Sequence, residues 1–330
     1  MKVVKHGMKI VAGLGAIDDY ERLVKAGADE FFCGYIPYEW LKKYGILFSL
    51  NRREVLYYNV QIGSLEDMKI LSKMVQYYGV PVKITLNSLY YTKEQYEWIY
   101  RYINELLSLG FDTYIFADPG LILYLRSKNV PIKIHVSGEL AEVNREMMKL
   151  WNEYDITRYI FHRKNTIEDM KECIKQNEKE NKKLEYEAFI LNELCHFTGG
   201  YCNSLHCDEL AHMCKVPYQP GIINEFSSQY QKTVDLFQRR REELEEEEWK
   251  KEGILGDSGC GLCSIKQLKE AGITHLKLVG RGNYIEKMER DIKELKKAIK
   301  MASQIETYEE YKSALMSELF VSGCSGKCYY

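Results

Sequence analysis

The stretch KIVAGLGAIDDYERLVKAGADEFFCGY, residues 9–35, indicates how the chain is expected to fold. Residues 9–15 form a short apolar run typical of a buried strand, and residues 17–26 have the spacing of an amphipathic helix that ends at Gly27. Residues 29–35 form a second apolar run. A strand, a helix and a second strand in this order predict two neighbouring parallel strands joined by a helix.

The same alternation continues along the rest of the chain. Further strands are expected at residues 82–86, 113–117, 132–136, 158–162, 186–191 and 276–279. Helices are expected at residues 64–78, 92–109, 141–151, 166–177, 264–271 and 284–301. This repeated pattern predicts an α/β fold, an eight-stranded parallel β/α barrel of the TIM type.

The seventh and eighth predicted strands are separated by a long insertion. We expect a barrel over residues 1–303, which includes a cysteine-rich, metal-binding insertion at residues 192–263. Within it, residues 237–252 are expected to form a solvated, charged helix. Residues 304–330 form a C-terminal extension, with a helical run and a tail that contains the sequence CSGKC.

Composition limits the class of protein. Of the 330 residues, 45% are hydrophobic and 28% are charged, so a sizeable core is expected and global disorder is excluded. The net charge of −2 offers no basic excess, so RNA stays a candidate partner that charge does not support. No run approaches the length of a membrane span, and the N-terminus lacks a signal-peptide pattern. We therefore expect a cytoplasmic protein with no membrane partner.

Cysteines gather in and around the insertion. Four of the ten lie in a short stretch and two follow later, namely Cys195, Cys202, Cys207, Cys214, Cys260 and Cys263. In a reducing compartment such a cluster indicates a metal site more than a disulfide framework. Four thiolates suit a 4Fe–4S cluster or a structural zinc ion. Spacings of six, eleven and forty-eight residues between Cys195, Cys202, Cys214 and Cys263 match neither zinc ribbons nor ferredoxins, so spacing leaves the metal open.

These motifs together resemble peptidase family U32, the collagenase-like peptidases. The resemblance covers most of the barrel and is carried by Glu187, Phe189, Leu194, Cys195, Cys202, Cys214, Lys215, Tyr218, Leu262, Cys263, Ala271, Gly272 and KLVGR at residues 277–281. Weaker similarities are AGADEFFCG near residue 30, FSLNRR at 48–53, TLNSL at 85–89, ADPG at 117–120 and HVSGELAEVN at 135–144. The chain departs from the family pattern at Leu191, Asn192 and Val279, which indicates a divergent member.

The resemblance implies an iron–sulfur protein of oxygen-independent hydroxylation. Several members of the family modify bases of transfer or ribosomal RNA, or the ring of a quinone precursor. The implied ligands of the 4Fe–4S cluster are Cys195, Cys202, Cys214 and Cys263, and either Cys207 or Cys260 could replace one of them. Zinc is the alternative cofactor. The other hypotheses are a collagenase-like peptidase and a non-catalytic, metal-binding partner subunit of a homo- or hetero-oligomer.

Polar residues near the ends of the predicted strands are candidates for the remaining site. We expect His135, Arg163 and Glu187 to be catalytic. An anionic small molecule or another substrate awaiting modification is expected to bind Arg52, Arg53, Asn87, Asn144 and Arg281, because arginines bind carboxylates and phosphates bidentately. The arginines could instead form ion pairs with barrel glutamates such as Glu187.

The remaining cysteines have separate interpretations. Cys33 and Cys173 fall in a predicted strand and a predicted helix, so they are expected to be core residues. Cys324 and Cys328, in the tail, could ligate a second metal, form a redox couple or deliver sulfur. A disordered tail without a role is the alternative.

Overall fold

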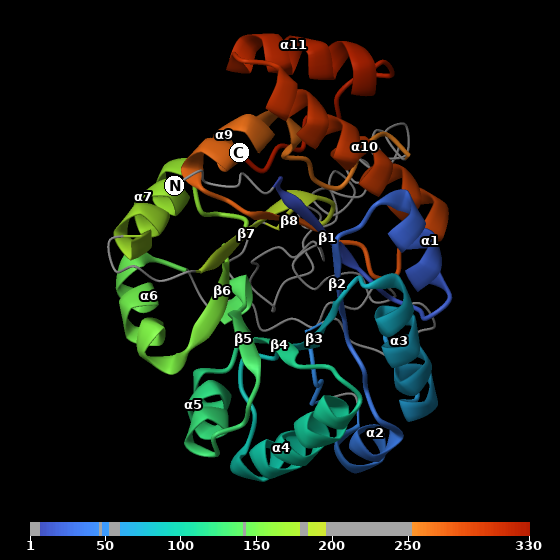
Figure 1. Cartoon of the computed structure of the whole chain (residues 1–330), viewed down its shortest axis with the longest axis vertical. Helices are drawn as coiled ribbons and strands as arrows, with labels where there is room; N and C mark the ends of the chain where they lie inside the picture. Colours follow the sequence, from blue (N-terminus) through green and yellow to red (C-terminus); the bar gives the residue numbers. More distant parts are fainter. Residues whose placement is uncertain (1–6, 46–47, 53–59, 141–142, 179–183, 196–252) are drawn as a thin grey trace, which may run out of the picture.

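Eight parallel strands close into a barrel in the order β1 to β8, which confirms the predicted fold (Figure 1). The computed structural model describes residues 7–45, 48–52, 60–140, 143–178, 184–195 and 253–330. The strands are β1 (Lys9–Gly13), β2 (Glu30–Cys33), β3 (Val82–Leu86), β4 (Thr113–Phe116), β5 (Lys133–Val136), β6 (Ile156–Ile160), β7 (Glu185–Leu191) and β8 (His275–Leu278). The barrel closes where β8 pairs with β1, with Lys9 opposite His275 and Ala12 opposite Leu278.

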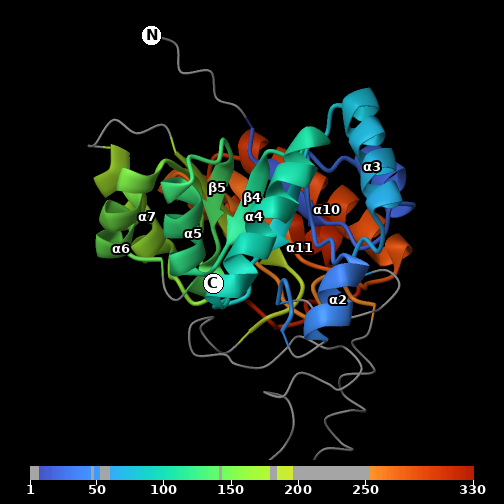
Figure 2. The same ribbon diagram turned by 90° about the horizontal axis from the view of Figure 1, so that it is seen from below.

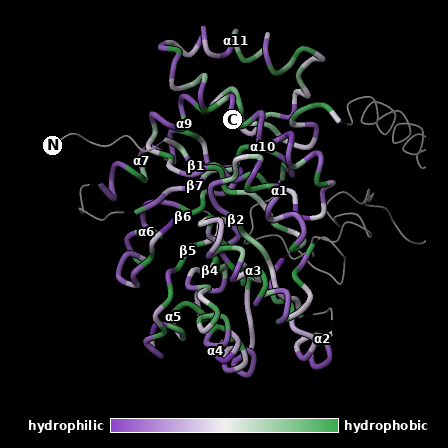
Figure 3. The backbone as a smooth tube through the Cα atoms, turned by 45° about the vertical axis from the view of Figure 1, so that its right-hand side comes forward, coloured by the Kyte–Doolittle hydropathy of each residue, from purple (hydrophilic) through white to green (hydrophobic). Residues whose placement is uncertain are grey.

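Helices surround the barrel, as Figures 1 and 2 show from the end and from the side. They are α1 (Asp19–Ala26), α2 (Tyr38–Tyr44), α3 (Leu65–Tyr78), α4 (Lys93–Ser108), α5 (Pro119–Ser127), α6 (Arg145–Trp151), α7 (Ile167–Glu178), α9 (Ile265–Ala271), α10 (Ile285–Gln304) and α11 (Tyr308–Leu319). Short 3-10 helices occur at η1 (Gly138–Leu140), η2 (Asn152–Tyr154) and η5 (Leu262–Ser264). Along the outer helices hydrophilic and hydrophobic residues alternate (Figure 3), as expected for helices that pack one face on a sheet.

Local signals explain where several helices begin and end. Ser64 caps α3 by accepting a hydrogen bond from the Asp67 amide at 3.0 Å, and Gly79 ends that helix in the left-handed region with φ 72°. Thr92 and Gln95 form a capping box at the start of α4. These are the boundaries that the sequence predicts most closely.

Some predicted boundaries differ from the structure, and two helices are not predicted. Strand β6 begins at Ile156, two residues before the predicted start. Its first half contains the polar residues Thr157 and Arg158, so the sequence shows no continuous apolar run there. The predicted helix 141–151 begins at Arg145 instead, since Asn144 caps it and η1 occupies residues 138–140. Helices α2 and α5 are not predicted, although Asp118 followed by Pro119 is a helix-start signal. The predicted charged helix at 237–252 lies outside the described residues.

Packing places the C-terminal extension against the last barrel helices. Tyr311 of α11 is fully buried, and its hydroxyl donates to the Leu262 carbonyl oxygen at 2.7 Å. Cys33 and Cys173 are buried in the core, as predicted. Within the described parts of the chain, no helix is both long and apolar enough to cross a membrane.

Candidate functional site

The inside of the barrel is divided into a charged layer, an apolar layer and a polar mouth. The apolar layer is a cluster of six buried side chains, namely Val11, Phe32, Ile115, Ile160, Phe189 and Val279. The charged layer comes from residues at or near the strand starts, and the polar mouth comes from the strand ends and the loops that follow them. In β/α barrels the mouth at the carboxyl ends of the strands is where chemistry takes place.

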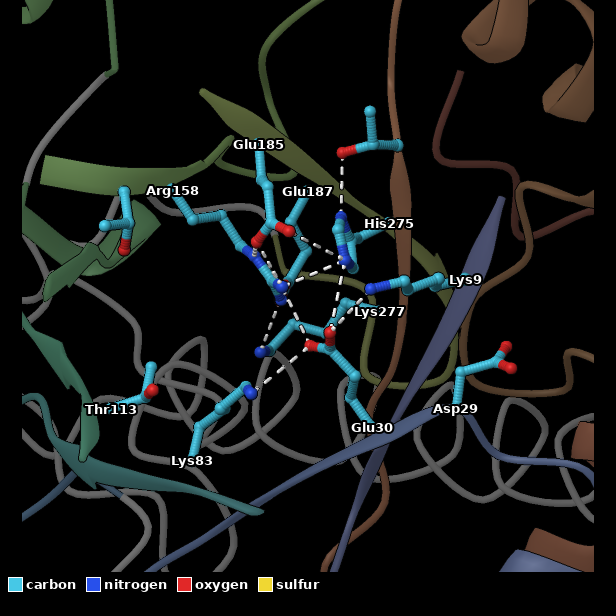
Figure 4. A network of polar contacts seen from close by, with 12 residues as sticks. Lys9, Asp29, Glu30, Lys83, Thr113, Arg158, Glu185, Glu187, His275 and Lys277 are labelled. Atoms are coloured by element: carbon cyan, nitrogen blue, oxygen red, sulfur yellow. Dashed lines mark hydrogen bonds and ion pairs between the residues drawn. The ribbon is translucent and has the colours of Figure 1, made fainter. Parts of the chain in front are cut away.

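Arg158 of β6 is the centre of the charged layer (Figure 4). Its guanidinium nitrogens lie 2.8 Å from a carboxylate oxygen of Glu187, 2.8 Å from one of Glu30 and 2.7 Å from one of Glu185. The guanidinium is 1% exposed, so these contacts are made without water competing for them. One arginine therefore ties together three strands, β2, β6 and β7.

Lysines complete the charge balance of this layer. Lys277 Nζ lies 2.7 Å from Glu187 Oε1 and 3.8 Å from the centre of the Phe32 ring. Burial alone would raise the pKa of Glu187, but the charges of Lys277 and Arg158 hold that pKa below its ordinary value. The pKa of Glu30 is likewise lowered despite burial, by His275 and Arg158. Both carboxylates therefore stay ionised in the folded protein.

The charged layer also contains two of the residues predicted to be catalytic. Glu187 forms ion pairs with Arg158 and Lys277, neither of which is among the arginines expected to pair with it. His135 is buried, and its Nδ1 atom has no hydrogen-bond partner in the described part of the chain. Burial, and then the charges of Arg158 and Lys83, lower the pKa of His135, so it is neutral. His135 is the last but one residue of β5, opposite Ile115 of β4, and the charged groups nearest to it are those of the charged layer.

Three buried arginines lie at the mouth. Arg281 follows β8, and its guanidinium nitrogens lie 3.4 Å from Thr85 Oγ1 and 3.4 Å from Asn51 Oδ1. Asn51 and Gln61 exchange two side-chain hydrogen bonds of 3.1 and 3.0 Å. These neutral partners were not selected from the sequence, although Asn51 and Thr85 lie in motifs quoted for the resemblance.

Gly34 makes room for this arrangement. A Cβ atom at residue 34 would lie 1.8 Å from Gln61 Oε1, 2.5 Å from Asn51 Nδ2 and 2.8 Å from Arg281 Nη1. A larger residue at position 34 would therefore have to displace the ends of the Gln61, Asn51 and Arg281 side chains.

Glu139 connects the other two arginines of the mouth. Its carboxylate lies 3.2 Å from Arg52 Nε and 3.7 Å from Arg163 Nη1. Arg163 stacks on the Phe189 ring with its guanidinium carbon 3.9 Å from the ring centre. Its Nε atom is buried and has no hydrogen-bond partner within the described residues. Burial would lower the pKa of Arg163, but Tyr329, Glu139 and Glu193 raise it, so the guanidinium stays charged.

The other predicted substrate-binding residues have different positions. Asn87 lies at the mouth, where its side-chain oxygen accepts a hydrogen bond from the Arg52 amide at 3.1 Å. Asn144 is exposed and accepts a hydrogen bond from the Met147 amide at 3.0 Å, so it caps α6. Arg53 lies outside the described residues. The mouth therefore brings Arg52, Asn87, Arg163 and Arg281 together and leaves Asn144 outside it.

Two of the four predicted cluster ligands are described. Cys195 is partly exposed just beyond β7, and its thiol is close enough to Arg163 to contribute to the raised pKa of that arginine. Cys263 lies in η5 and is partly exposed. Cys202, Cys207 and Cys214 lie outside the described residues. In the described ranges, the structure has no three His, Cys, Asp or Glu side chains arranged to hold a metal ion as they stand.

Comparisons with known proteins point to one family. The family described as Peptidase family U32 matches residues 15–327. The tRNA hydroxylation protein P of Escherichia coli (strain K12) is 30% identical over 102 residues, which are 31% of this chain and 22% of that protein. The tRNA hydroxylation protein P1 of Bacillus subtilis (strain 168) is 22% identical over 201 residues, which are 61% of this chain and 42% of that protein. The matched segments therefore span less than half of either relative.

A solved structure from the same family overlaps weakly with this chain. It is titled the U32 peptidase Mk0906, and it covers 58% of this chain and 72% of its own length at 11% identity and a TM-score of 0.42.

The charged layer predicts a large loss of stability when its central cation is removed. Arg158→Met should lower the free energy of unfolding by about 3–5 kcal/mol, because it leaves buried carboxylates without a partner. Chemical denaturation, followed by circular dichroism, measures the change. The control is Arg145→Met, since Arg145 is 58% exposed and pairs with the exposed Glu146. A loss for Arg158→Met no larger than for the control would contradict the role of the layer.

The lowered pKa of Glu187 predicts a loss of stability in acid. A carboxyl whose pKa is lower in the folded than in the unfolded state stabilises the fold fully above the unfolded value, about 4.3. That contribution disappears as the pH falls through the folded pKa. The free energy of unfolding should therefore decline below about pH 4.3, and less steeply in Glu187→Gln. Glu153→Gln, at an exposed position, should keep the wild-type slope, and an unchanged slope in Glu187→Gln would count against the ion pairs.

Proposed function

Because this chain belongs to peptidase family U32, we propose that it is an iron–sulfur enzyme that hydroxylates a base of transfer RNA without dioxygen, or makes a related redox modification. Two relatives that are called tRNA hydroxylation proteins motivate the substrate class. The observation that carries the proposal is the position of Cys195, the first cysteine of the cysteine-rich segment, near the buried Arg163 of the mouth.

The donor set fits a cluster. Iron–sulfur clusters are held by cysteine thiolates, and the chain provides them in the segment that begins at Cys195. Cys195, Cys202 and Cys214 would hold three irons, with Cys263, as the resemblance implies, or Cys207 as the fourth ligand. The cluster would supply electron transfer when bound. A partly exposed Cys195 at the end of β7 would keep the cluster within reach of a substrate at the mouth.

Arginines of the mouth would hold the anionic part of the substrate. Arg163 has a charged guanidinium and a buried Nε–H without a partner in the described residues, which is a donor available to a phosphate oxygen. Arg281 lies 3.4 Å from Thr85 Oγ1 and 3.4 Å from Asn51 Oδ1, and its guanidinium could also bind a phosphate oxygen of the substrate. With a net charge of −2, binding of RNA would depend on such local groups.

Apolar and polar residues of the barrel would orient the base. The apolar layer closes the floor of the mouth, with Phe189 beneath Arg163. Glu139 fixes the directions of Arg52 and Arg163 through its two carboxylate oxygens. These contacts would hold the guanidinium groups in place before the substrate arrives, which reduces the entropy lost on binding.

Metal analysis tests the cofactor. The full chain, purified without oxygen, should contain about four irons and four sulfides and show visible charge-transfer absorption. Cys195→Ser should lose the iron and the absorption, whereas Cys173→Ser, a change in the core of α7, should keep both. Protein that carries zinc and no iron would refute the proposed cofactor.

Nucleoside analysis tests the substrate. Mass spectrometry of transfer RNA from cells without this protein should reveal one nucleoside that lacks an oxygen atom, and restoring the wild-type protein should return it. Arg281→Gln should lower that nucleoside by roughly tenfold or more with unchanged iron content, because a charged hydrogen bond contributes about 1.5–3 kcal/mol. Arg145→Gln, at the surface, should behave as wild type. Identical nucleosides with and without the protein would refute transfer RNA as the substrate.

A further inference from the structure

The C-terminal extension places an aromatic side chain, Tyr329, in the mouth. Its ring packs against the apolar layer. Its hydroxyl reaches two groups of the barrel and its loops. One is the Asn192 carbonyl oxygen, to which the hydroxyl donates a hydrogen bond, and the other is the Arg163 guanidinium. A residue from the tail beyond α11 therefore touches one of the buried arginines of the mouth.

Backbone hydrogen bonds hold the tail in this position. The Cys260 amide donates to the Lys327 carbonyl oxygen at 2.8 Å, and the Tyr329 amide donates to the Cys260 carbonyl oxygen at 2.8 Å. Cys260 in turn forms an antiparallel bridge with Leu191, the last residue of β7. The tail therefore extends a small ribbon that starts from the barrel, and the main chain of Tyr329 is fixed as well as its side chain.

The turn that accepts the hydrogen bond of Tyr329 has a strained backbone. Asn192 and Glu193 follow β7 with φ values of 68° and 55°, in the left-handed region that residues other than glycine rarely adopt. Such a turn persists only when its surroundings hold it. The Asn192 side-chain amide donates to the Val279 carbonyl oxygen at 3.1 Å and to Asp291 Oδ2 at 3.0 Å. The Tyr329 hydroxyl adds a contact to the main chain of the same residue.

Gly259 makes room for the tyrosine beside this turn. A Cβ atom at residue 259 would lie 3.0 Å from the Tyr329 hydroxyl oxygen and 2.9 Å from the Leu194 amide nitrogen. The φ of Gly259, 151°, is also one that residues with a side chain rarely adopt. The hydroxyl therefore lies against main chain, which restricts where it can accept a hydrogen bond.

Arg163 is the group on which this hydroxyl acts. The guanidinium lies 3.7 Å from Glu139 and 3.9 Å from Glu193, and these distances are longer than the roughly 3.2 Å of ordinary N–H···O hydrogen bonds. A guanidinium only donates hydrogen bonds, so the Tyr329 hydroxyl accepts from Arg163 and donates to Asn192. Burial raises the pKa of Tyr329, although the charge of Arg163 opposes the shift, so the hydroxyl keeps the proton that it donates.

We propose that Tyr329 is a positioning residue of the substrate site, which holds the Arg163 guanidinium in place over the Phe189 ring. The buried Nε–H of Arg163, which has no partner in the described residues, then keeps a set direction in which to meet an anion. A donor that is held before the substrate arrives reduces the entropy lost on binding. That Arg163 binds the substrate rests on the proposed function, whereas the contact between Tyr329 and Arg163 does not.

Chemical modification tests the contact without any substrate. Phenylglyoxal reacts with guanidinium groups, and mass spectrometry of the full chain, purified without oxygen, gives the rate at each arginine. Tyr329→Phe keeps the ring and removes the hydroxyl. Arg163 should then react roughly tenfold faster or more, the size expected when a hydrogen bond to a charged group is lost. Arg281, which is 5% exposed where Arg163 is 6% exposed, should keep its rate.

Tyr330→Phe is the matched control variant. It removes the neighbouring hydroxyl of the tail, which donates to the Phe189 carbonyl oxygen at 2.9 Å, so Arg163 should react as in wild type. Tyr329→Met, which also keeps an apolar side chain on the apolar layer, should repeat the result of Tyr329→Phe. An unchanged rate at Arg163 in both Tyr329 variants would overturn the proposal. So would an equal rise at Arg281, which would mean that the whole mouth had loosened, or the same rise in Tyr330→Phe.

Transfer RNA tests whether this positioning serves the reaction. The nucleoside that depends on the wild-type protein should fall roughly tenfold in cells that make Tyr329→Phe, while the iron content of the purified variant stays that of wild type. Arg163→Gln should also lower the nucleoside, and the double variant should lower it no further, because the tyrosine acts through the arginine. Losses that add in the double variant would overturn the proposal. If no nucleoside of transfer RNA depends on the protein, the proposed function fails, and the modification rates of Arg163 still decide the role of Tyr329.

Discussion

Burial of the Arg158 guanidinium inside the barrel is the constraint on which the rest of the structure depends. A charge with 1% exposure can persist only if carboxylates from several directions pair with it. Glu30, Glu185 and Glu187 supply them from β2 and β7, so the strands must keep the register that places these residues at one level. Lys277 from β8, Lys83 from β3 and Lys9 from β1 add further positive charges to the layer.

The charged layer gives the mouth a rigid base. Two aromatic rings of the apolar layer contact cations. Lys277 of the charged layer lies over the Phe32 ring, and Arg163 of the mouth lies over the Phe189 ring. The polar mouth is therefore built on packed side chains and not on loops alone. Arginines held in this way are suited to recognising an anion, because their directions are set before binding.

The C-terminal extension contributes residues to the mouth, as the barrel does. Tyr311 anchors α11 to η5, and Tyr329 and Tyr330 carry the tail across to β7. Contacts of Tyr329 with Arg163 connect the tail to the same arginine that lies beside Cys195. Order in the tail and geometry at the mouth are therefore linked.

The sequence by itself determined the barrel, the eight strands in order and most helix ends, because apolar periodicity and caps are local properties. It also indicated the arginines that would reach the mouth. Only the tertiary structure decided that Glu187 pairs with Arg158 and Lys277, since the side chains that meet inside a barrel depend on the stagger between strands. It also decided that the tail pairs with Cys260, because a contact between residues so far apart in sequence leaves no local pattern to read.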